Sequence, residues 1–125
     1  MTEAAGPRPT LGRDLRIRRE AEFRAVYARR ARAADERLAV YALARGRPPT
    51  RLGISVGRRL GGGSVERNRT KRLIREAFRE GRAAWPTGFD VVVVALGRDY
   101  TLREVQDRLR RLVPEAIRRA QRTAS

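Results

Sequence analysis

The fold of this chain is constrained most strongly by one apolar run at residues 89–96, FDVVVVAL. Its β-branched residues favour a strand, and the absence of polar–apolar alternation indicates a strand that is covered on both faces. The run follows a long helical pattern, so we expect it to pair in parallel with the strand that precedes that helix. It is far shorter than the roughly 20 residues that span a membrane. The sequence therefore predicts a sheet with this strand at its centre.

We expect the element order αβββαβα, in which the patterns locate two of the three strands before the second helix. Helical spacing covers residues 19–31 and 66–79, and strand patterns cover residues 37–44 and 51–57, separated by a turn that contains Pro48 and Pro49. A capping box, Thr101-x-x-Glu104, begins an amphipathic helix that Pro114 perturbs and that Ala116, Ile117 and Ala120 can continue. The fold class is α/β (α+β), a two-layer sandwich in which the helices cover one side of a single small sheet.

Length and charge limit the domain organisation and the function. With 125 residues, 41% of them hydrophobic, we expect one domain over residues 17–122, a mobile basic arm over residues 1–16 and a short tail over residues 123–125. The net charge of +16 attracts nucleic acid or an anionic membrane surface. The sequence has no histidine and no cysteine, which excludes imidazole bases, thiolate nucleophiles and Cys/His zinc sites. We expect a cytoplasmic protein with no membrane partner.

The helix at residues 66–79 separates apolar from basic residues. Leu73, Ile74, Ala77 and Phe78 fall on one arc, which can be buried. The opposite arc is basic and nearly free of acids, whereas an ordinary solvated face alternates in sign. This arc favours contact with a polyanion over simple solvation; it contains Lys71, Arg82, Arg75, Asn68, Arg79 and Arg72.

Two further features leave alternatives open. Phe23 and Tyr27 stand four residues apart on one helix face, where they can pack in a core or stack on bases. Strand 51–57 presents Gly53, Ser55 and Gly57 outward, a face with almost no side chains. Glycines in a strand often mark a close approach, either by a nucleic-acid strand or by a helix of the same protein.

Three stretches together closely resemble the protein subunit of bacterial ribonuclease P: Phe23-x-x-x-Tyr27, RLGISVGRR at residues 51–59 and ERNRTKRLIREAF at residues 66–78. The resemblance extends over about residues 17–112. It implies a fold like ribosomal protein S5 domain 2, with a left-handed βαβ crossover that departs from the right-handed rule. It also implies that a catalytic RNA with bound Mg²⁺ hydrolyses the phosphodiester at the 5′ end of mature tRNA. The protein would then dock on that RNA and hold the 5′ leader of precursor tRNA.

The same resemblance implies two sets of binding residues and no catalytic or metal-binding residue in the protein, with Mg²⁺ bound mainly by the RNA. The first set docks on the catalytic RNA and contains Arg67, Asn68, Arg69, Lys71, Arg72 and Arg75. The second set forms a leader-binding cleft between the first helix and the sheet and contains Phe23, Tyr27, Tyr41, Ser55 and Arg59. The main alternative is a ribosomal or other structural RNA-binding protein without a role in tRNA processing. A stand-alone nuclease and a DNA-binding regulator are further rivals, and we expect no DNA partner.

Overall fold

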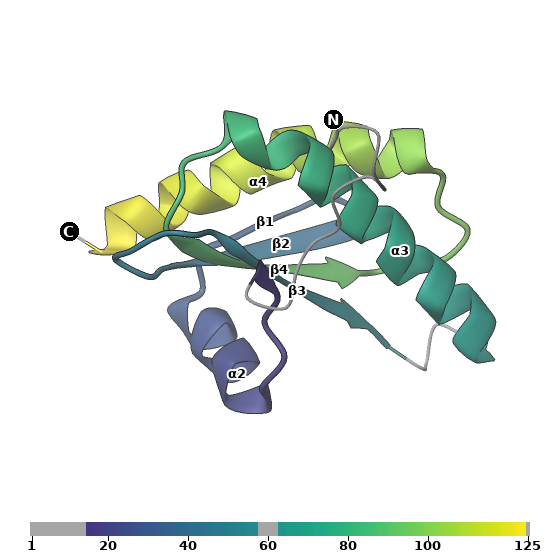
Figure 1. Ribbon diagram of the computed structural model, residues 1–125, viewed down its shortest axis with the longest axis horizontal. Helices are drawn as coiled ribbons and strands as arrows, with labels where there is room; N and C mark the ends of the chain where they lie inside the picture. The colour runs from purple at the N-terminus through teal and green to yellow at the C-terminus, as the bar shows by residue number, and fades with distance from the viewer. Residues whose placement is uncertain (1–14, 58–62, 125) are drawn as a thin grey trace, which may run out of the picture.

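The computed structural model describes residues 15–57 and 63–124, and its elements follow the expected order αβββαβα (Figure 1). Strand β1 is only three residues long, and no sequence pattern had assigned it. A short 3-10 turn, η3, follows the long basic helix. The elements are α2 (Glu20–Arg29), β1 (Arg32–Ala34), β2 (Leu38–Ala44), β3 (Arg51–Val56), α3 (Gly63–Gly81), η3 (Arg82–Ala84), β4 (Phe89–Ala95) and α4 (Leu102–Ala124).

The four strands form one sheet in the order β1-β2-β4-β3. Strand β4 pairs antiparallel with β2 and parallel with β3, where Leu52 lies opposite Val91. The predicted central position of β4 and its parallel pairing with the strand before the basic helix are therefore confirmed. The left hand of the crossover from β3 through α3 to β4 stays a prediction.

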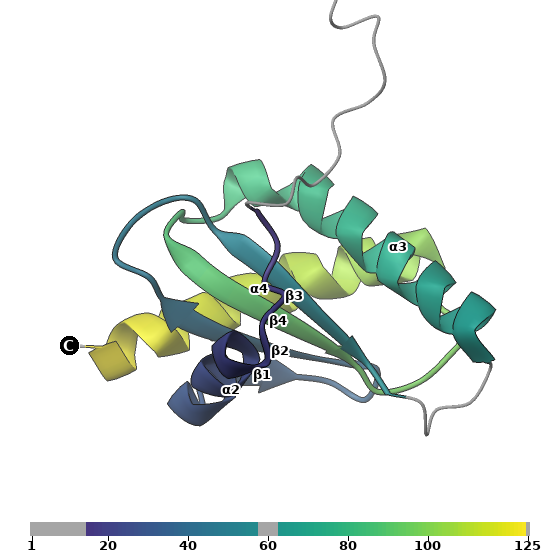
Figure 2. The same ribbon diagram turned by 60° about the horizontal axis from the view of Figure 1, so that its bottom comes forward.

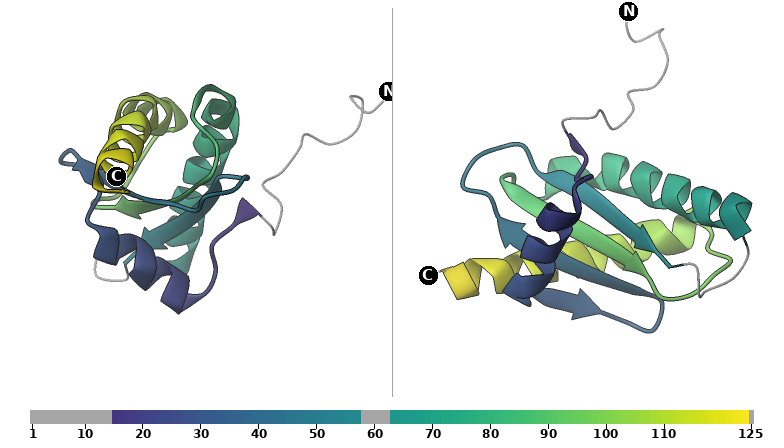
Figure 3. Two further views of the ribbon diagram at one scale, coloured as in Figure 1. Left: turned by 90° about the vertical axis from the view of Figure 1, so that its left-hand side faces the viewer. Right: turned by 90° about the horizontal axis from the view of Figure 1, so that it is seen from below.

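The side chains of β4 alternate between two hydrophobic clusters. Val91 and Val93 pack into the main core under α3 and α4, whereas Val92 packs into a second cluster with Ile17 and Val26. Helices α3 and α4 accordingly lie over one face of the sheet and α2 lies against the other (Figures 1 and 3). The expectation that the helices cover one side is wrong for α2, because the second face of β4 is also apolar and needs a cover.

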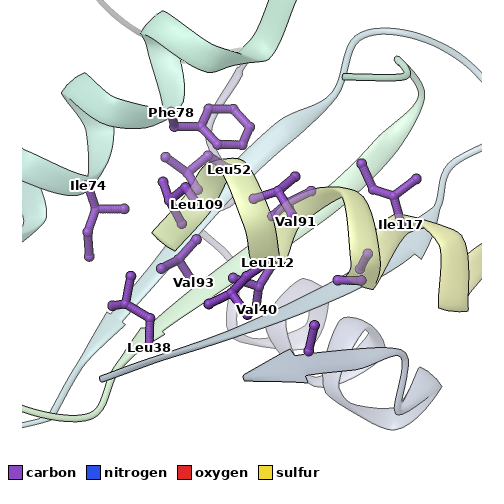
Figure 4. Packing of buried hydrophobic residues seen from close by; sticks show 14 of the residues in the cluster. Leu38, Val40, Leu52, Ile74, Phe78, Val91, Val93, Leu109, Leu112 and Ile117 are labelled. Carbon is purple, nitrogen blue, oxygen red and sulfur yellow. The ribbon is translucent and has the colours of Figure 1, made fainter. Parts of the chain in front are cut away.

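The main core joins the two long helices to the sheet. Ile74 and Phe78 of α3 meet Leu109 of α4 above Val91 and Val93 (Figure 4). These side chains are almost fully shielded from solvent. Burial of each stabilises the fold by about 1.5–3 kcal/mol. The Phe78 ring also lies 5.3 Å from the ring of Trp85, so the turn after α3 extends the same core.

Helix α4 continues through Pro114 to Ala124, where the sequence had suggested a perturbation. A proline inside a helix removes one backbone hydrogen bond. Val113, Ala116, Ile117 and Ala120, on both sides of Pro114, are all buried in the main core. Their burial outweighs the local cost of the proline. At the start of α4 the Thr101 hydroxyl accepts the Glu104 N–H at 3.1 Å, as the capping box predicts.

The start of the described chain belongs to the folded domain. Arg16 forms an isolated parallel bridge with Leu52, and the Ile17 N–H donates to the Leu52 carbonyl at 2.8 Å. This segment therefore runs along the edge of β3, as the turned view shows (Figure 2). The rest of the predicted N-terminal arm lies outside the described residues. In the part of the chain that the structure describes, no helix is long and apolar enough to cross a membrane.

Asp35 joins the β1–β2 turn to α4. Its Oδ1 accepts the N–H groups of Arg37 and Leu38 at 2.8 and 2.9 Å, and its Oδ2 pairs with Arg108 and with Arg111. Burial by itself raises the pKa of Asp35, but these backbone and guanidinium hydrogen bonds outweigh burial and lower the pKa to about 2.

The ionised form of Asp35 should therefore stabilise the fold. Because its pKa is lower in the folded chain than the ordinary value of 3.8, this stabilisation is present above about pH 4 and is lost as the pH falls toward 2. Urea unfolding between pH 2 and 7 should show Asp35→Asn to be less stable than wild type at pH 7, with a flatter pH dependence below pH 4. Asp107→Asn, at an exposed ion pair on α4, is the control. An Asp35→Asn profile parallel to wild type would contradict the role of this carboxylate.

Candidate nucleic-acid interface

Helix α3 turns its motif residues away from the core. Thr70, Ile74, Ala77 and Phe78 are its buried residues, which confirms the predicted apolar arc. The six residues expected to dock on RNA all keep solvent exposure: Asn68, Arg69 and Arg72 are exposed, and Arg67, Lys71 and Arg75 are half-buried. The burial of the apolar arc thus fixes the rotation of α3 and keeps the six motif residues at the surface.

Two arginines of α3 are neutralised by acids. Arg79 pairs with Glu76 and approaches Glu80 at 3.9 Å, so the prediction of a nearly acid-free face is wrong at this end of the helix. Arg69 donates to the Tyr100 carbonyl at 3.1 Å and lies 4.0 Å from the Glu66 carboxylate. The structure thus gives Arg69 a contact with the start of α4.

The rest of the basic set carries uncompensated charge. Among the residues that the structure describes, none of the following has an ion pair with an acid: Arg67, Lys71, Arg72 and Arg75. Like charges three or four residues apart on a helix repel each other. This set, the basic surface below, is therefore poor for helix stability and suited to an anionic partner.

A second group of predicted residues meets on the other face of the sheet. Tyr27 of α2 contacts the ring of Tyr41 of β2 edge to face, with ring centroids 4.9 Å apart, and lies 6.4 Å from the ring of Phe23. Burial raises the pKa of Tyr27, and a hydrogen bond between the side chains of Tyr27 and Ser55 opposes that rise. All four side chains are half-buried. We call Phe23, Tyr27, Tyr41 and Ser55 the aromatic surface.

The side-chain-poor face of β3 is covered at one glycine and open at another. A Cβ atom on Gly53 would lie 2.9 Å from the ring of Phe23, so at this position the chain's own helix makes the close approach. A Cβ atom on Gly57 would meet no atom within 4 Å. This face was expected to be covered either by a nucleic-acid strand or by a helix of the same protein. At Gly53 it is covered by the first helix of the protein itself. Arg59, the fifth residue of the expected cleft, lies outside the described residues.

Arg32 adds a cation that sequence reasoning did not assign to this surface. Its Nε donates to the Tyr41 hydroxyl at 3.2 Å, and its guanidinium carbon lies 5.8 Å from the centre of that ring. The β1–β2 register, in which Arg32 lies opposite Tyr41, brings the two side chains together. The β1–β2 register would have identified Arg32 as part of this surface. It could not be predicted, because β1 is too short to be recognised from its sequence pattern.

An ion-pair network fixes α2 to the sheet. Arg51 of β3 donates to both oxygens of Asp90 at 2.8 Å and to Glu22 of α2 at 3.2 Å. Burial raises the pKa of Glu22, but the charge and the hydrogen bond of Arg51 outweigh it, so the pKa of Glu22 lies below its usual value. The hydrogen bond with Asp90, the largest effect, raises the pKa of Arg51. This network holds the helix that carries Phe23 and Tyr27.

The fold and these two surfaces define a class: a small, strongly basic α+β domain with a basic helix face and an aromatic surface, features typical of RNA-binding proteins. A family model described as Ribonuclease P matches residues 11–117. A protein from Desulfovibrio desulfuricans, "Ribonuclease P protein component", is 45% identical over 87 residues, which are 68% of this chain and 66% of the relative. One of the same name from Shouchella clausii is 36% identical over 107 residues, 83% of this chain and 87% of the relative.

Solved structures agree with the sequence comparisons. The Staphylococcus aureus RNase P protein superposes with a TM-score of 0.70 at 31% identity, covering 79% of this chain and 92% of that protein. The Thermotoga maritima RNase P protein gives a TM-score of 0.66 at 29% identity, covering 75% and 90%. The chain therefore belongs to the ribonuclease P protein family, the family of the protein component of ribonuclease P. This membership gives it a role in the ribonuclease P complex and disfavours a structural RNA-binding protein outside tRNA processing.

A substitution on the buried face of α3 should affect stability, whereas a substitution on its basic face should affect RNA binding and leave stability unchanged. Phe78→Ala removes a buried ring and should lower the free energy of unfolding by about 3–5 kcal/mol. Arg72→Met removes an exposed charge that has no acid partner within residues 15–57 and 63–124, and should leave the melting temperature nearly unchanged. Thermal melts of both variants check this, with Val65→Ala, at a residue that is 81% exposed, as the control. If Arg72→Met unfolds the domain while Phe78→Ala does not, the helix is rotated differently from this description.

Proposed function

We propose that this chain docks on the catalytic RNA of ribonuclease P through its basic surface and holds the 5′ leader of precursor tRNA on its aromatic surface. One observation carries the proposal: the helices that bear the two surfaces, α3 and α2, lie on opposite faces of the same sheet (Figure 3). Two RNA segments can therefore contact the protein at the same time. A structural RNA-binding protein without a substrate would need only the first surface.

The basic surface suits a phosphate backbone. Arginine presents a planar fork that matches phosphate oxygens, and three of the four side chains in this set are arginines. Each phosphate neutralised by such a side chain releases counterions, so affinity depends steeply on salt. The absence of base-reading acids and amides from the set, other than neighbouring Asn68, supports recognition of RNA shape and backbone over sequence.

The aromatic surface suits an unpaired strand. Base–aromatic stacking contributes about 1–3 kcal/mol per base and tolerates any sequence. Phe23, Tyr27 and Tyr41 pack against the second cluster, which contains Val92, and keep partial exposure. Arg32 supplies a charge for the leader phosphates beside them. Arg59 belongs to the same proposal, on the strength of the family motif alone.

The chemistry of cleavage is proposed to belong to the RNA subunit and its Mg²⁺ ions. The sequence offers no imidazole or thiolate for general acid–base or nucleophilic work. Over residues 15–57 and 63–124 no group of three or more His, Cys, Asp or Glu side chains lies close enough together to hold a metal ion. The ion would supply Lewis-acid and water-activating chemistry from the RNA side. A cytoplasmic site of action, where precursor tRNA is made, completes the proposal.

Reconstitution tests the proposal directly. The purified chain mixed with a bacterial ribonuclease P RNA and precursor tRNA at low magnesium should restore 5′ processing that the RNA alone performs poorly. The chain without the RNA should cleave nothing. Cleavage by the chain alone would instead support a stand-alone nuclease, and no stimulation would contradict the subunit role.

The basic surface should determine how steeply RNA docking depends on salt. Replacing Lys71 and Arg72 together by Met should flatten the plot of log affinity for the catalytic RNA against log salt by about one to two units, because two phosphate contacts are lost. The matched control replaces Arg110 and Arg118, which have acid partners on α4, and changes the net charge equally. Equal slopes for the two double variants would mean that α3 does not meet the RNA.

The aromatic surface should determine preference for leader-bearing substrate. Tyr27→Ala should reduce the preference of the holoenzyme for precursor over mature tRNA by about 1–3 kcal/mol, the scale of one lost stack. Docking on the catalytic RNA should be unaffected. Tyr27→Phe, which keeps the ring and loses the hydrogen bond to Ser55, is the matched variant and should retain most of the preference. A lowered melting temperature with an undiminished preference would assign Tyr27 to packing alone.

A further inference from the structure

The first two turns of α3 lie beyond the apolar core. The buried residues of this helix begin only at Thr70, and Val65 in the first turn is 81% exposed. In two views the start of the helix projects past the ends of the strands (Figures 1 and 3). Arg67 and Asn68, which are expected to dock on RNA, belong to this part of the helix. Apolar burial therefore contributes little to holding the segment that presents them.

Two polar contacts join this segment to the β4–α4 loop, residues 96–101. The Oε2 atom of Glu66 accepts the Asp99 N–H at 3.3 Å, and the guanidinium of Arg69 donates to the Tyr100 carbonyl at 3.1 Å. The Glu66 side chain is 22% exposed, and its carboxylate lies 4.0 Å from the Arg69 guanidinium. A largely covered carboxylate at the start of α3 thus faces the loop rather than open solvent.

The loop itself is held by Arg37, which directly precedes β2. Arg37 donates to both carboxylate oxygens of Glu104 on α4, at 2.7 and 3.2 Å, and its guanidinium carbon lies 4.3 Å from the centre of the Tyr100 ring. The hydroxyl of the buried Tyr100 donates to the Arg37 carbonyl at 2.6 Å and accepts the Gly97 N–H at 2.9 Å. These contacts connect the loop to β2 and to α4. The start of α3 is therefore joined to a part of the chain that is already fixed.

The charge of Glu66 has the wrong sign for a helix that meets RNA. A carboxylate repels phosphate, and this one also lies beside a guanidinium that could otherwise contact phosphate. The helix dipole favours an acid in the first turn, but that gain does not require the carboxylate to face the loop. The contact with the Asp99 N–H gives Glu66 a role in position, which offsets its unfavourable charge.

We propose that Glu66 is a positioning residue for RNA docking. It fastens the first turns of α3 to the β4–α4 loop and so holds Arg67 and Asn68 in place for an RNA backbone. Arg69 shares this role through the Tyr100 carbonyl. The proposal rests on the proposed function for the identity of the RNA, and it adds to that function an acid that improves docking by fixing the helix that carries the basic surface.

Two substitutions of Glu66 separate position from charge. Glu66→Gln removes the charge and keeps a side-chain oxygen for the Asp99 N–H, so its affinity for the catalytic RNA should equal or exceed that of wild type. Glu66→Ala removes both the charge and the acceptor, so its affinity should fall below that of Glu66→Gln by about two- to tenfold, the scale of one hydrogen bond. Glu80→Ala is the matched control, because Glu80 lies at the far end of α3, 3.9 Å from Arg79, and its affinity should not fall.

Hydrogen exchange of the free chain reports on the start of α3 without RNA. In an α-helix the amides of residues 70–73 donate to the carbonyls of residues 66–69. These amides and the Asp99 N–H should exchange faster in Glu66→Ala than in wild type, whereas Glu66→Gln and Glu80→Ala should keep the wild-type rates.

The two measurements fail separately. If wild type does not bind the catalytic RNA, the proposed function falls, whereas hydrogen exchange still decides whether Glu66 holds the start of α3. Equal RNA affinities of Glu66→Ala and Glu66→Gln, or unchanged exchange in Glu66→Ala, would overturn the positioning role.

Discussion

Both faces of strand β4 are packed against other parts of the chain, and the positions of the basic surface and the aromatic surface depend on that packing. Val91 and Val93 require a cover on one side of the sheet and Val92 requires one on the other. The long helices satisfy the first requirement and the ten-residue helix α2 satisfies the second. Because a sheet separates them, the basic surface and the aromatic surface face different directions. Under the proposed function, this separation lets the protein contact the catalytic RNA and the substrate at the same time.

The ion pairs of Arg51 add a polar connection between α2 and the sheet to the apolar packing of α2. Replacing a buried ion pair by apolar residues is often neutral, so such a pair is weak evidence for stability. Here the bidentate contact with Asp90 anchors Arg51 in the sheet, and the remaining contact reaches Glu22 on α2. With α2 held in this way, the ring of Phe23 fills the space above Gly53 and Tyr27 reaches Tyr41 and Ser55. The geometry of the aromatic surface follows from a polar network beneath it.

Local patterns predicted the parts of this structure that local residues determine. The four valines predicted the central position of β4, and the helical spacing of apolar residues predicted which face of α3 is buried. The features that were missed depend on residues distant in sequence. The face that α2 covers is set by Val92, and the contact of Arg32 with Tyr41 depends on the strand register. At Pro114 the burial of neighbouring side chains outweighs the local tendency of proline to end a helix.

Hydroxyl-radical footprinting of the protein tests most directly the claim that two RNAs meet two surfaces. Oxidation of Tyr27 and Tyr41 would be followed by mass spectrometry in the free chain, in its complex with the catalytic RNA, and after addition of precursor or leaderless tRNA. The account predicts that the catalytic RNA protects residues of α3 and leaves both tyrosines reactive, and that only leader-bearing tRNA then protects the tyrosines. Protection of the tyrosines by the catalytic RNA alone, or their continued reactivity with precursor tRNA bound, would contradict it.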